Sequence, residues 1–183
     1  MILTVTLNPS VDISYKLASL EIDNVNRVNH ISKTAGGKGL NVSRVLRQLD
    51  EEVIATGFLG GSLGEFIRSK LFRLGIIDGF VEINQDTRNC IAIIHEGKQT
   101  EILESGPEIE HGEQQKFFDH FTHFINKAEI ITISGSLPKG LSEDFYVQLL
   151  EIAKQRKTKV LLDTKGQLLK QTITSTVKPF LIK

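Results

Sequence analysis

The chain lacks the features that mark secreted, membrane-spanning and nucleic-acid-binding proteins. It has one cysteine, Cys90, so no internal disulfide can form. Lys and Arg together number 22, as do Asp and Glu, which leaves no overall field to attract nucleic acid or an anionic membrane surface. The N-terminus shows no secretory signal, and no apolar run approaches the roughly 20 residues that cross a bilayer. These absences predict a cytoplasmic protein with no nucleic-acid or membrane partner.

The residues that are present alternate between strand-like and helix-like patterns. With 183 residues, 40% of them hydrophobic and 24% charged, the chain suits one globular domain with a real core. Strand-like stretches are expected at 2–7, 52–58, 77–83, 129–133 and 160–163, and helices between 42–49, 63–74, 117–125 and from a cap at Ser142. Such alternation predicts an α/β fold with a doubly wound, mostly parallel sheet.

Two excursions, at about 11–33 and 87–104, break this alternation. Each contains two polar, alternating stretches, at 12–17 and 25–31 in the first and at 87–95 and 99–104 in the second, which indicate strands with one solvated face. The second is expected to turn at Glu96-Gly97-Lys98. We expect the excursions to pair as a small antiparallel β lid over the edge where open α/β sheets bind ligands.

A glycine-rich segment, Thr34-Ala-Gly-Gly-Lys-Gly-Leu-Asn41, enters an amphipathic helix. Glycines at this point let backbone N–H groups approach an oxygen-rich ligand at the helix N-terminus. The segment is not a Walker P-loop, because Ser32 stands where that motif needs Gly and Gly39 stands where it needs Ser or Thr. A plain tight turn into a helix remains the alternative.

Four other side chains are candidates for binding a phosphorylated sugar. Asp12 follows the first strand and could accept hydrogen bonds from two vicinal hydroxyls, or it could be an Asx-turn residue after Pro9. Arg27 and Arg88, one on each excursion, could converge on a phosphate, whereas either alone would read as a solvated surface charge. Ser136, in a turn after a buried strand, offers a hydroxyl at the ligand edge, although a Gly/Pro turn would look the same.

The remaining polar candidates give weaker signals. His120 and His123 share a helix face but have no third ligand nearby, so no metal site is expected. Cys90 has no His at a recognisable catalytic spacing and is expected to pack inside its strand.

Five segments together resemble the phosphofructokinase-B family of the ribokinase-like superfamily, along the whole chain. They are Asn8-Pro-Ser-Val-Asp12, Ala35-Gly-Gly-Lys-Gly-Leu-Asn-Val-Ser-Arg44, Gly57-Phe-Leu-Gly-Gly61, Thr87-Arg88 and Ser134-Gly-Ser-Leu-Pro-Lys-Gly140. Within the family, the glycine segment, Arg88-Asn-Cys-Ile-Ala-Ile and Gln99-Thr-Glu-Ile-Leu-Glu-Ser-Gly-Pro107 are most similar to the branch that phosphorylates tagatose 6-phosphate.

The resemblance implies a sugar-phosphate kinase. It would transfer the γ-phosphoryl of ATP, with Mg²⁺, to the 1-hydroxyl of D-tagatose 6-phosphate, giving the 1,6-bisphosphate. The resemblance implies sugar-binding roles for Asp12, Gly36, Gly37, Lys38 and Asn41, phosphate-binding roles for Arg27 and Arg88, and a place in the same cleft for Ser136. It also implies a homodimer whose lids pair between subunits. Phosphorylation of fructose 1-phosphate, or sugar-phosphate binding without catalysis, are the alternatives.

One departure from the family concerns its catalytic base. The family's Asn-x-x-Glu and Gly-Ala-Gly-Asp segments, which carry Mg²⁺ handling, the base and the nucleotide site, are expected beyond Lys183. No Gly-x-Gly-Asp occurs in this sequence. Residues 1–183 are therefore expected to form an incomplete ribokinase-like domain without the nucleotide-binding part, with no catalytic base and no metal ligand of its own.

Overall fold

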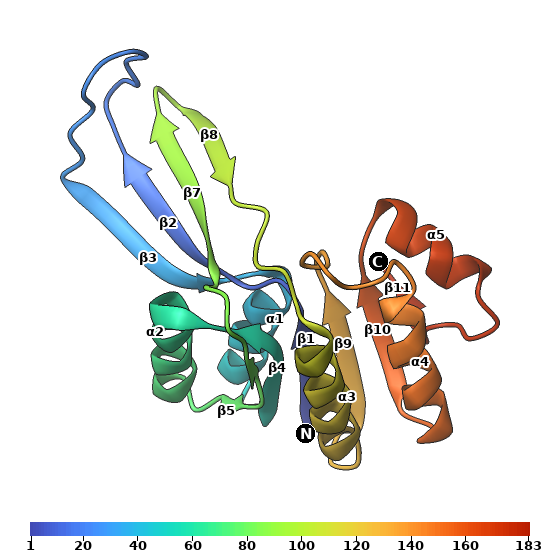
Figure 1. The fold of residues 1–183 in the computed structure, drawn as a ribbon. Helices are drawn as coiled ribbons and strands as arrows, with labels where there is room; N and C mark the ends of the chain where they lie inside the picture. The colour runs from blue at the N-terminus through green and yellow to red at the C-terminus, as the bar shows by residue number, and fades with distance from the viewer.

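The computed structural model covers residues 1–183 and contains two sheets, one inside the body and one rising from it (Figure 1). The strands of the body sheet are β1 (Ile2–Thr6), β4 (Val53–Leu59), β5 (Ile77–Asp78), β6 (Val81–Glu82), β9 (Ile130–Ser134), β10 (Lys159–Asp163) and β11 (Leu181–Ile182). Their order is β11-β10-β9-β1-β4-β5, with β6 also on β4, and every pairing is parallel. The predicted parallel sheet is confirmed.

Helices cover both faces of this sheet, as a doubly wound fold requires. They are α1 (Lys38–Gln48), α2 (Gly61–Arg73), α3 (His111–Ile125), α4 (Phe145–Gln155) and α5 (Gly166–Thr174). Figure 1 shows α3 and α4 in front of the sheet, and α1 and α2 on the left of the body, near β4. None of these helices combines the length and the apolar character that a membrane crossing demands.

Two apolar clusters explain why the helices pack on opposite faces. In β4, Ile54 and Phe58 join the cluster formed with α3 and α4, whereas Val53, Ala55 and Leu59 join the one formed with α1 and α2. Successive side chains of a strand point to opposite faces, so one fully buried strand supplies both cores.

The second sheet is the lid, and it is mixed rather than antiparallel. Its strands are β2 (Ser10–Lys16), β3 (His30–Gly36), β7 (Arg88–His95) and β8 (Lys98–Leu103), in the order β3-β2-β7-β8. The two hairpins are antiparallel within themselves, but β2 and β7 pair in parallel. The reason is topological: β2 follows β1 and β7 follows β6, so both leave the same edge of the body sheet in the same direction.

Several expected boundaries differ from the structure. The second strand of the first excursion begins at His30 instead of near residue 25, and Lys98 belongs to β8, which leaves Glu96 and Gly97 as the turn. The N-cap of α4 is Asp144, because the Ser142 hydroxyl bonds the Asp144 carboxylate instead of a helix N–H.

Two further differences lie in the body. The stretch at 77–83 divides into β5 and β6, and α5 forms where no element was expected. These differences leave the architecture unchanged.

Candidate active-site cleft

A cleft of about 950 Å³ lies between the underside of the lid and the carboxyl ends of the body strands. Most of the predicted binding residues line it: Asp12, Gly37, Lys38, Asn41, Arg88 and Ser136. They come from two lid strands, the turn into α1, the first turn of α1 and the turn after β9. The topology therefore gathers residues spread over more than a hundred positions into one concave site, at the edge where doubly wound sheets bind ligands.

The glycine turn is built for close backbone approach. A Cβ on Gly36 would lie 2.0 Å from the Asp12 carboxylate, and one on Gly39 would lie 2.2 Å from Thr6 Oγ1. Gly37, between them, has φ of +113°, a conformation that side chains with a Cβ rarely adopt. A plain tight turn would need only the last of these three features. The other two bring the start of α1, with its unpaired N–H groups, against the cleft floor.

Asp12 presents a half-buried carboxylate to the cleft. It lies inside β2, opposite Thr34 on one side and Cys90 on the other, so the alternative of an Asx turn is wrong. Its one side-chain contact is with Ser10, whose hydroxyl donates to Asp12 Oδ1 at 2.7 Å. No Lys or Arg pairs with it. The carboxylate therefore keeps acceptor capacity for a ligand's hydroxyl groups.

Arg88 connects the lid to the body at the mouth of the cleft. Its Nη1 donates to the Glu104 carbonyl at 2.8 Å and its Nη2 donates to the Asn8 carbonyl at 3.0 Å. Its Nε is buried and has no partner, and no carboxylate pairs with the guanidinium. The alternative of a solvated surface charge is wrong. Arg88 is a half-buried cation that two carbonyls hold in place.

Arg27 does not join these residues within one chain. Ser10 of β2 lies opposite Arg88 and Gly36 at the cleft end of the lid, whereas Lys16 lies opposite His30 at the outer end. Arg27 comes just before His30 and is exposed. The six residue steps from Ser10 to Lys16 span about 20 Å of strand. The expected approach of Arg27 and Arg88 across the cleft mouth is therefore not found.

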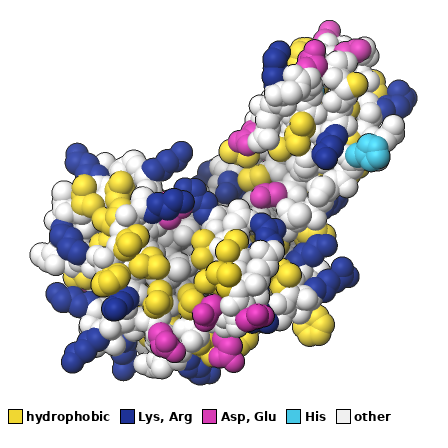
Figure 2. All heavy atoms as spheres, turned by 180° about the vertical axis from the view of Figure 1, so that it is seen from behind, with side chains coloured by type: hydrophobic (Ala, Val, Ile, Leu, Met, Phe, Trp, Pro, Cys, Tyr) yellow, Lys and Arg dark blue, Asp and Glu magenta, His cyan; other side chains and the backbone are white.

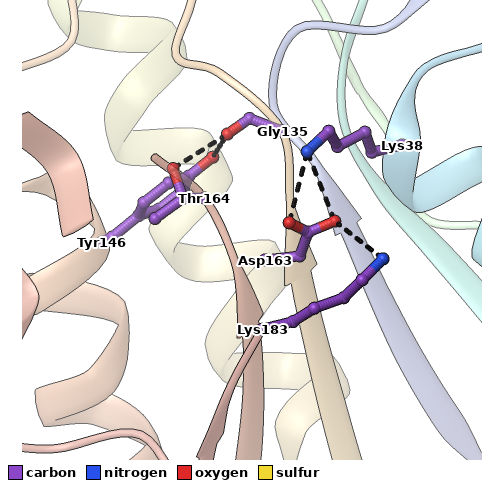
Figure 3. Close-up of polar contacts among 6 residues, drawn as sticks. All are labelled: Lys38, Gly135, Tyr146, Asp163, Thr164 and Lys183. Atoms are coloured by element: carbon purple, nitrogen blue, oxygen red, sulfur yellow. Dashed lines mark hydrogen bonds and ion pairs between the residues drawn. The ribbon is translucent and has the colours of Figure 1, made fainter. Parts of the chain in front are cut away.

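Lys38, from the glycine turn, reaches across the cleft to the body sheet (Figure 3). Its Nζ lies 3.2 Å from Asp163 Oδ1, at the carboxyl end of β10, and Lys183 Nζ lies 4.0 Å from the other oxygen. Asp163 was not among the binding residues predicted from the sequence. A signal was present, because Asp163 ends a predicted strand and so lies at the ligand edge.

Tyr146 supports the same side of the cleft from below. Its hydroxyl donates to the Gly135 carbonyl at 3.2 Å, as does the Thr164 hydroxyl (Figure 3). Burial raises the pKa of the Tyr146 phenol well above its usual value, and the negative charge of Asp163 raises this pKa further. Tyr146 therefore stays neutral and holds the turn that presents Ser136.

Two polar atoms on the cleft floor have no partner. Thr6 Oγ1 and Asn8 Oδ1 are buried without a hydrogen bond, and both residues line the cleft. Buried polar atoms are rarely left unpaired, so unpaired ones in a concave site are candidates to meet a polar ligand. No sequence pattern distinguished Thr6 from the other threonines of the chain.

Comparison with known proteins identifies the family of this chain. A model of the pfkB carbohydrate kinase family matches residues 5–183. The chain belongs to the pfkB family. The family predicted from the sequence segments is therefore confirmed, and the cleft lies in a pfkB carbohydrate-kinase fold.

Solved structures of relatives agree with this assignment. A possible 1-phosphofructokinase from Thermotoga maritima is 30% identical, with a TM-score of 0.94 over 100% of this chain and 59% of its own. A putative phosphofructokinase from Staphylococcus aureus is 36% identical, with a TM-score of 0.83 over 93% of this chain and 55% of its own. Ribokinase from Giardia lamblia, 16% identical, shares the fold, with a TM-score of 0.71 over 90% of this chain and 55% of its own. This pfkB chain spans little more than half the length of these relatives.

The family resemblance implies two further groups for a pfkB chain, ATP and Mg²⁺. No three His, Cys, Asp or Glu side chains lie together in a way that could hold a metal ion. Asp163, at the carboxyl end of β10, already pairs with Lys38. These residues do not by themselves fit Mg²⁺, which needs several oxygen ligands.

The weaker candidates from the sequence are one cysteine and two histidines. Cys90 lines the cleft beside Asp12 and is free. His120 and His123 are exposed and make edge contacts with the Phe124 ring, with centroid distances of 6.1 and 5.2 Å.

Proposed function

We propose that this chain binds a ketohexose phosphate in the cleft beneath the lid. The observation that carries this proposal is the free, half-buried Asp12 carboxylate, which lies against the glycine turn and in the same cleft as the carbonyl-held cation of Arg88. A sugar phosphate offers both hydroxyl donors for a carboxylate and an anion for a guanidinium. The binding would serve ATP-dependent, Mg²⁺-requiring phosphorylation of D-tagatose 6-phosphate to D-tagatose 1,6-bisphosphate.

Each residue has a stated role in this proposal. Asp12 accepts hydrogen bonds from two vicinal hydroxyls, and Gly36 and Gly37 let the sugar approach the backbone. Asn41, on the first turn of α1, adds an amide donor and acceptor. Ser136 borders the same space from the turn after β9. Arg88 holds the existing phosphate through the N–H groups that its two carbonyl bonds leave free.

Lys38 has a different role, because its ion pair with Asp163 holds its Nζ on the far wall of the cleft. In the proposed function Lys38 Nζ donates from this wall to a hydroxyl oxygen of the sugar, whose phosphate Arg88 holds. The exposed fraction of the Lys38 side chain, 54%, leaves it accessible to a ligand.

Phosphorylation of fructose 1-phosphate is the second candidate function. The Thermotoga maritima relative is described as a possible 1-phosphofructokinase, and it shares the fold over the whole of this chain. Asp12 and Arg88 would serve both sugars, since each offers vicinal hydroxyls and a phosphate. The two candidates differ in which hydroxyl points away from the phosphate-binding end of the cleft.

The proposal includes a homodimer that forms through the lid. The lid exposes large apolar side chains that a single chain leaves uncovered, including Ile31 at 56% and Ile102 at 55%. Apolar side chains exposed on a sheet that rises from the body favour contact with a second copy. In Figure 2 the lid projects from the body at the upper right.

Calorimetric titration of the 183-residue protein with tagatose 6-phosphate and fructose 1-phosphate tests the proposal. We expect one sugar phosphate to bind more tightly, and Asp12→Asn to weaken it about tenfold, because the amide accepts through one oxygen only. Asp119→Asn, on the exposed side of α3, is the matched control and should leave binding unchanged. If neither sugar phosphate binds, or if Asp12→Asn binds as wild type does, the proposal is wrong. A coupled assay with ATP and Mg²⁺ tests phosphorylation separately; because residues 1–183 contain no Gly-x-Gly-Asp segment, we expect no turnover from this chain alone.

A further inference from the structure

A second, smaller cavity lies behind the lid, between β3, α1 and α2. Its volume is about 260 Å³, and its floor is apolar, formed in part by the buried side chains of Leu40, Leu71 and Ile76. It is separate from the sugar-phosphate cleft except at Thr34, which lines both. A concave apolar floor of this size, close to the lower end of small-molecule sites at about 300 Å³, is a candidate binding site.

The rim of this cavity is cationic and has no counter-charge. Lys33, Arg44, Lys70 and Arg73 line it, and none of its lining residues is acidic. None of these four side chains takes part in an ion pair. Such a gathering of like charges around a low-dielectric floor raises the local positive potential.

Arg68, on the same helix α2, has acidic partners, unlike the four cations of the rim. It pairs with Glu65 at 3.4 Å and with Asp78. The cations of the rim instead make neutral contacts: Arg44 donates to the Asn41 amide oxygen, and Lys70 lies 4.9 Å from the Phe66 ring centroid. Their positive charge is therefore available to a ligand.

We propose that this cavity binds a small organic phosphate that carries an apolar group. The phosphate would lie at the rim, where Arg44 and Arg73 offer guanidinium forks and Lys33 and Lys70 offer point charges. The apolar group would lie on Leu40, Leu71 and Ile76. Inorganic phosphate would leave this floor uncovered, and a neutral apolar molecule would leave the cationic rim uncompensated, so the ligand needs both parts.

Methyl NMR of the 183-residue protein tests this assignment with phenyl phosphate as the probe. Methyl groups of Leu71 and Ile76 report on the cavity, and those of Leu103 and Leu168 report on the cleft. We expect saturable shifts of Leu71 and Ile76, with phenyl phosphate binding at least tenfold more tightly than inorganic phosphate or phenol.

Charge-removing variants complete the test. The double variant Lys70→Gln/Arg73→Gln lies at the accessible end of α2, and it should weaken phenyl phosphate at least tenfold at Leu71 and Ile76. Arg156→Gln, exposed at the end of α4, is the matched control and should bind as wild type does. The proposal is overturned if shifts occur only at Leu103 and Leu168, or if the double variant binds normally. It is also overturned if inorganic phosphate or phenol alone binds as tightly as phenyl phosphate.

Discussion

The body sheet and the lid differ most in how much of each is buried. Every residue of β4, at the centre of the body, is buried, whereas every residue of β8, at the edge of the lid, is exposed. The body sheet separates two apolar clusters, and the lid contributes to only one of them, mainly through Val11 and Ile13 of β2. Figure 1 shows the result, a covered sheet from which an uncovered one rises.

Because of this difference, the residues that stabilise the fold and the residues that line the cleft are largely different ones. The residues of the two apolar clusters hold the body together, whereas the charged side chains of Asp12 and Arg88 in the lid line the cleft. Connecting segments and solvated strands commonly carry function on a rigid scaffold. Mutations in the body should therefore change the free energy of unfolding, and mutations where lid meets body should change binding.

The largest effect is expected from Phe117→Ala in the body. Phe117 is fully buried on α3. Its ring centroid lies 5.0 Å from that of Phe58 and 6.0 Å from that of Phe121. Removing it leaves a cavity and should lower the free energy of unfolding by about 3–5 kcal/mol. Chemical denaturation monitored by circular dichroism measures this loss. Ile102→Ala in the lid is the matched control, and a loss of similar size there would show that the lid is part of the stabilising core.

The second effect is expected from Gly36→Ala, where lid and body meet. The added Cβ would lie 2.0 Å from the Asp12 carboxylate, so one of the two must move. We expect at least about a hundredfold loss of sugar-phosphate affinity, because misplacing a group that contacts the ligand loses most of its contribution. Isothermal titration measures it. Gly112→Ala, in α3 with nothing within 4 Å of the new Cβ, should bind normally; equal losses in both variants would contradict the role of Gly36.

The same division explains what could be predicted from sequence. Buried strands such as β1 and β4 appear as continuous apolar runs, so their existence and parallel pairing followed from local pattern. The lid strands β2 and β3 mix polar and apolar residues instead of forming mainly apolar runs. As a result, the start of β3 was misplaced, and the parallel pairing of β2 with β7 was missed because it depends on which edge of the body both strands leave.

The cleft shows the same limit at the level of single residues. Asp12, the glycine turn and Arg88 were found because they lie in recognisable segments. Asp163 was missed because its partner, Lys38, is 125 positions away. Thr6 is one of several buried threonines, and its unpaired hydroxyl is a property of its neighbours in space. Contacts between residues that are far apart in the chain cannot be predicted from a local sequence pattern.

Arg88→Gln is expected to have a smaller and more specific effect. The phosphate role predicts about a tenfold loss of affinity for tagatose 6-phosphate with little change for unphosphorylated tagatose. A purely structural role, through the bonds to the Asn8 and Glu104 carbonyls, predicts equal losses for both sugars. Parallel titrations of the two sugars, with the thermal midpoint of the variant recorded, separate these roles. Equal losses would overturn the phosphate assignment.

The smallest effect is expected from Arg27→Ala, because Arg27 lies at the outer end of the lid, about 20 Å of strand away from Arg88. In one chain it cannot contact a phosphate that Arg88 holds, so monomeric protein should keep its sugar-phosphate affinity within about twofold. If lids pair between two copies, Arg27 of one copy could approach the cleft of the other, and the loss would then appear only where dimers form. Titrations at protein concentrations on either side of the dimerisation midpoint, set by sedimentation velocity, distinguish these cases, with Arg156→Ala as the control. A tenfold loss in the monomer would contradict the single-chain geometry, and no loss in either state would exclude Arg27 from phosphate binding.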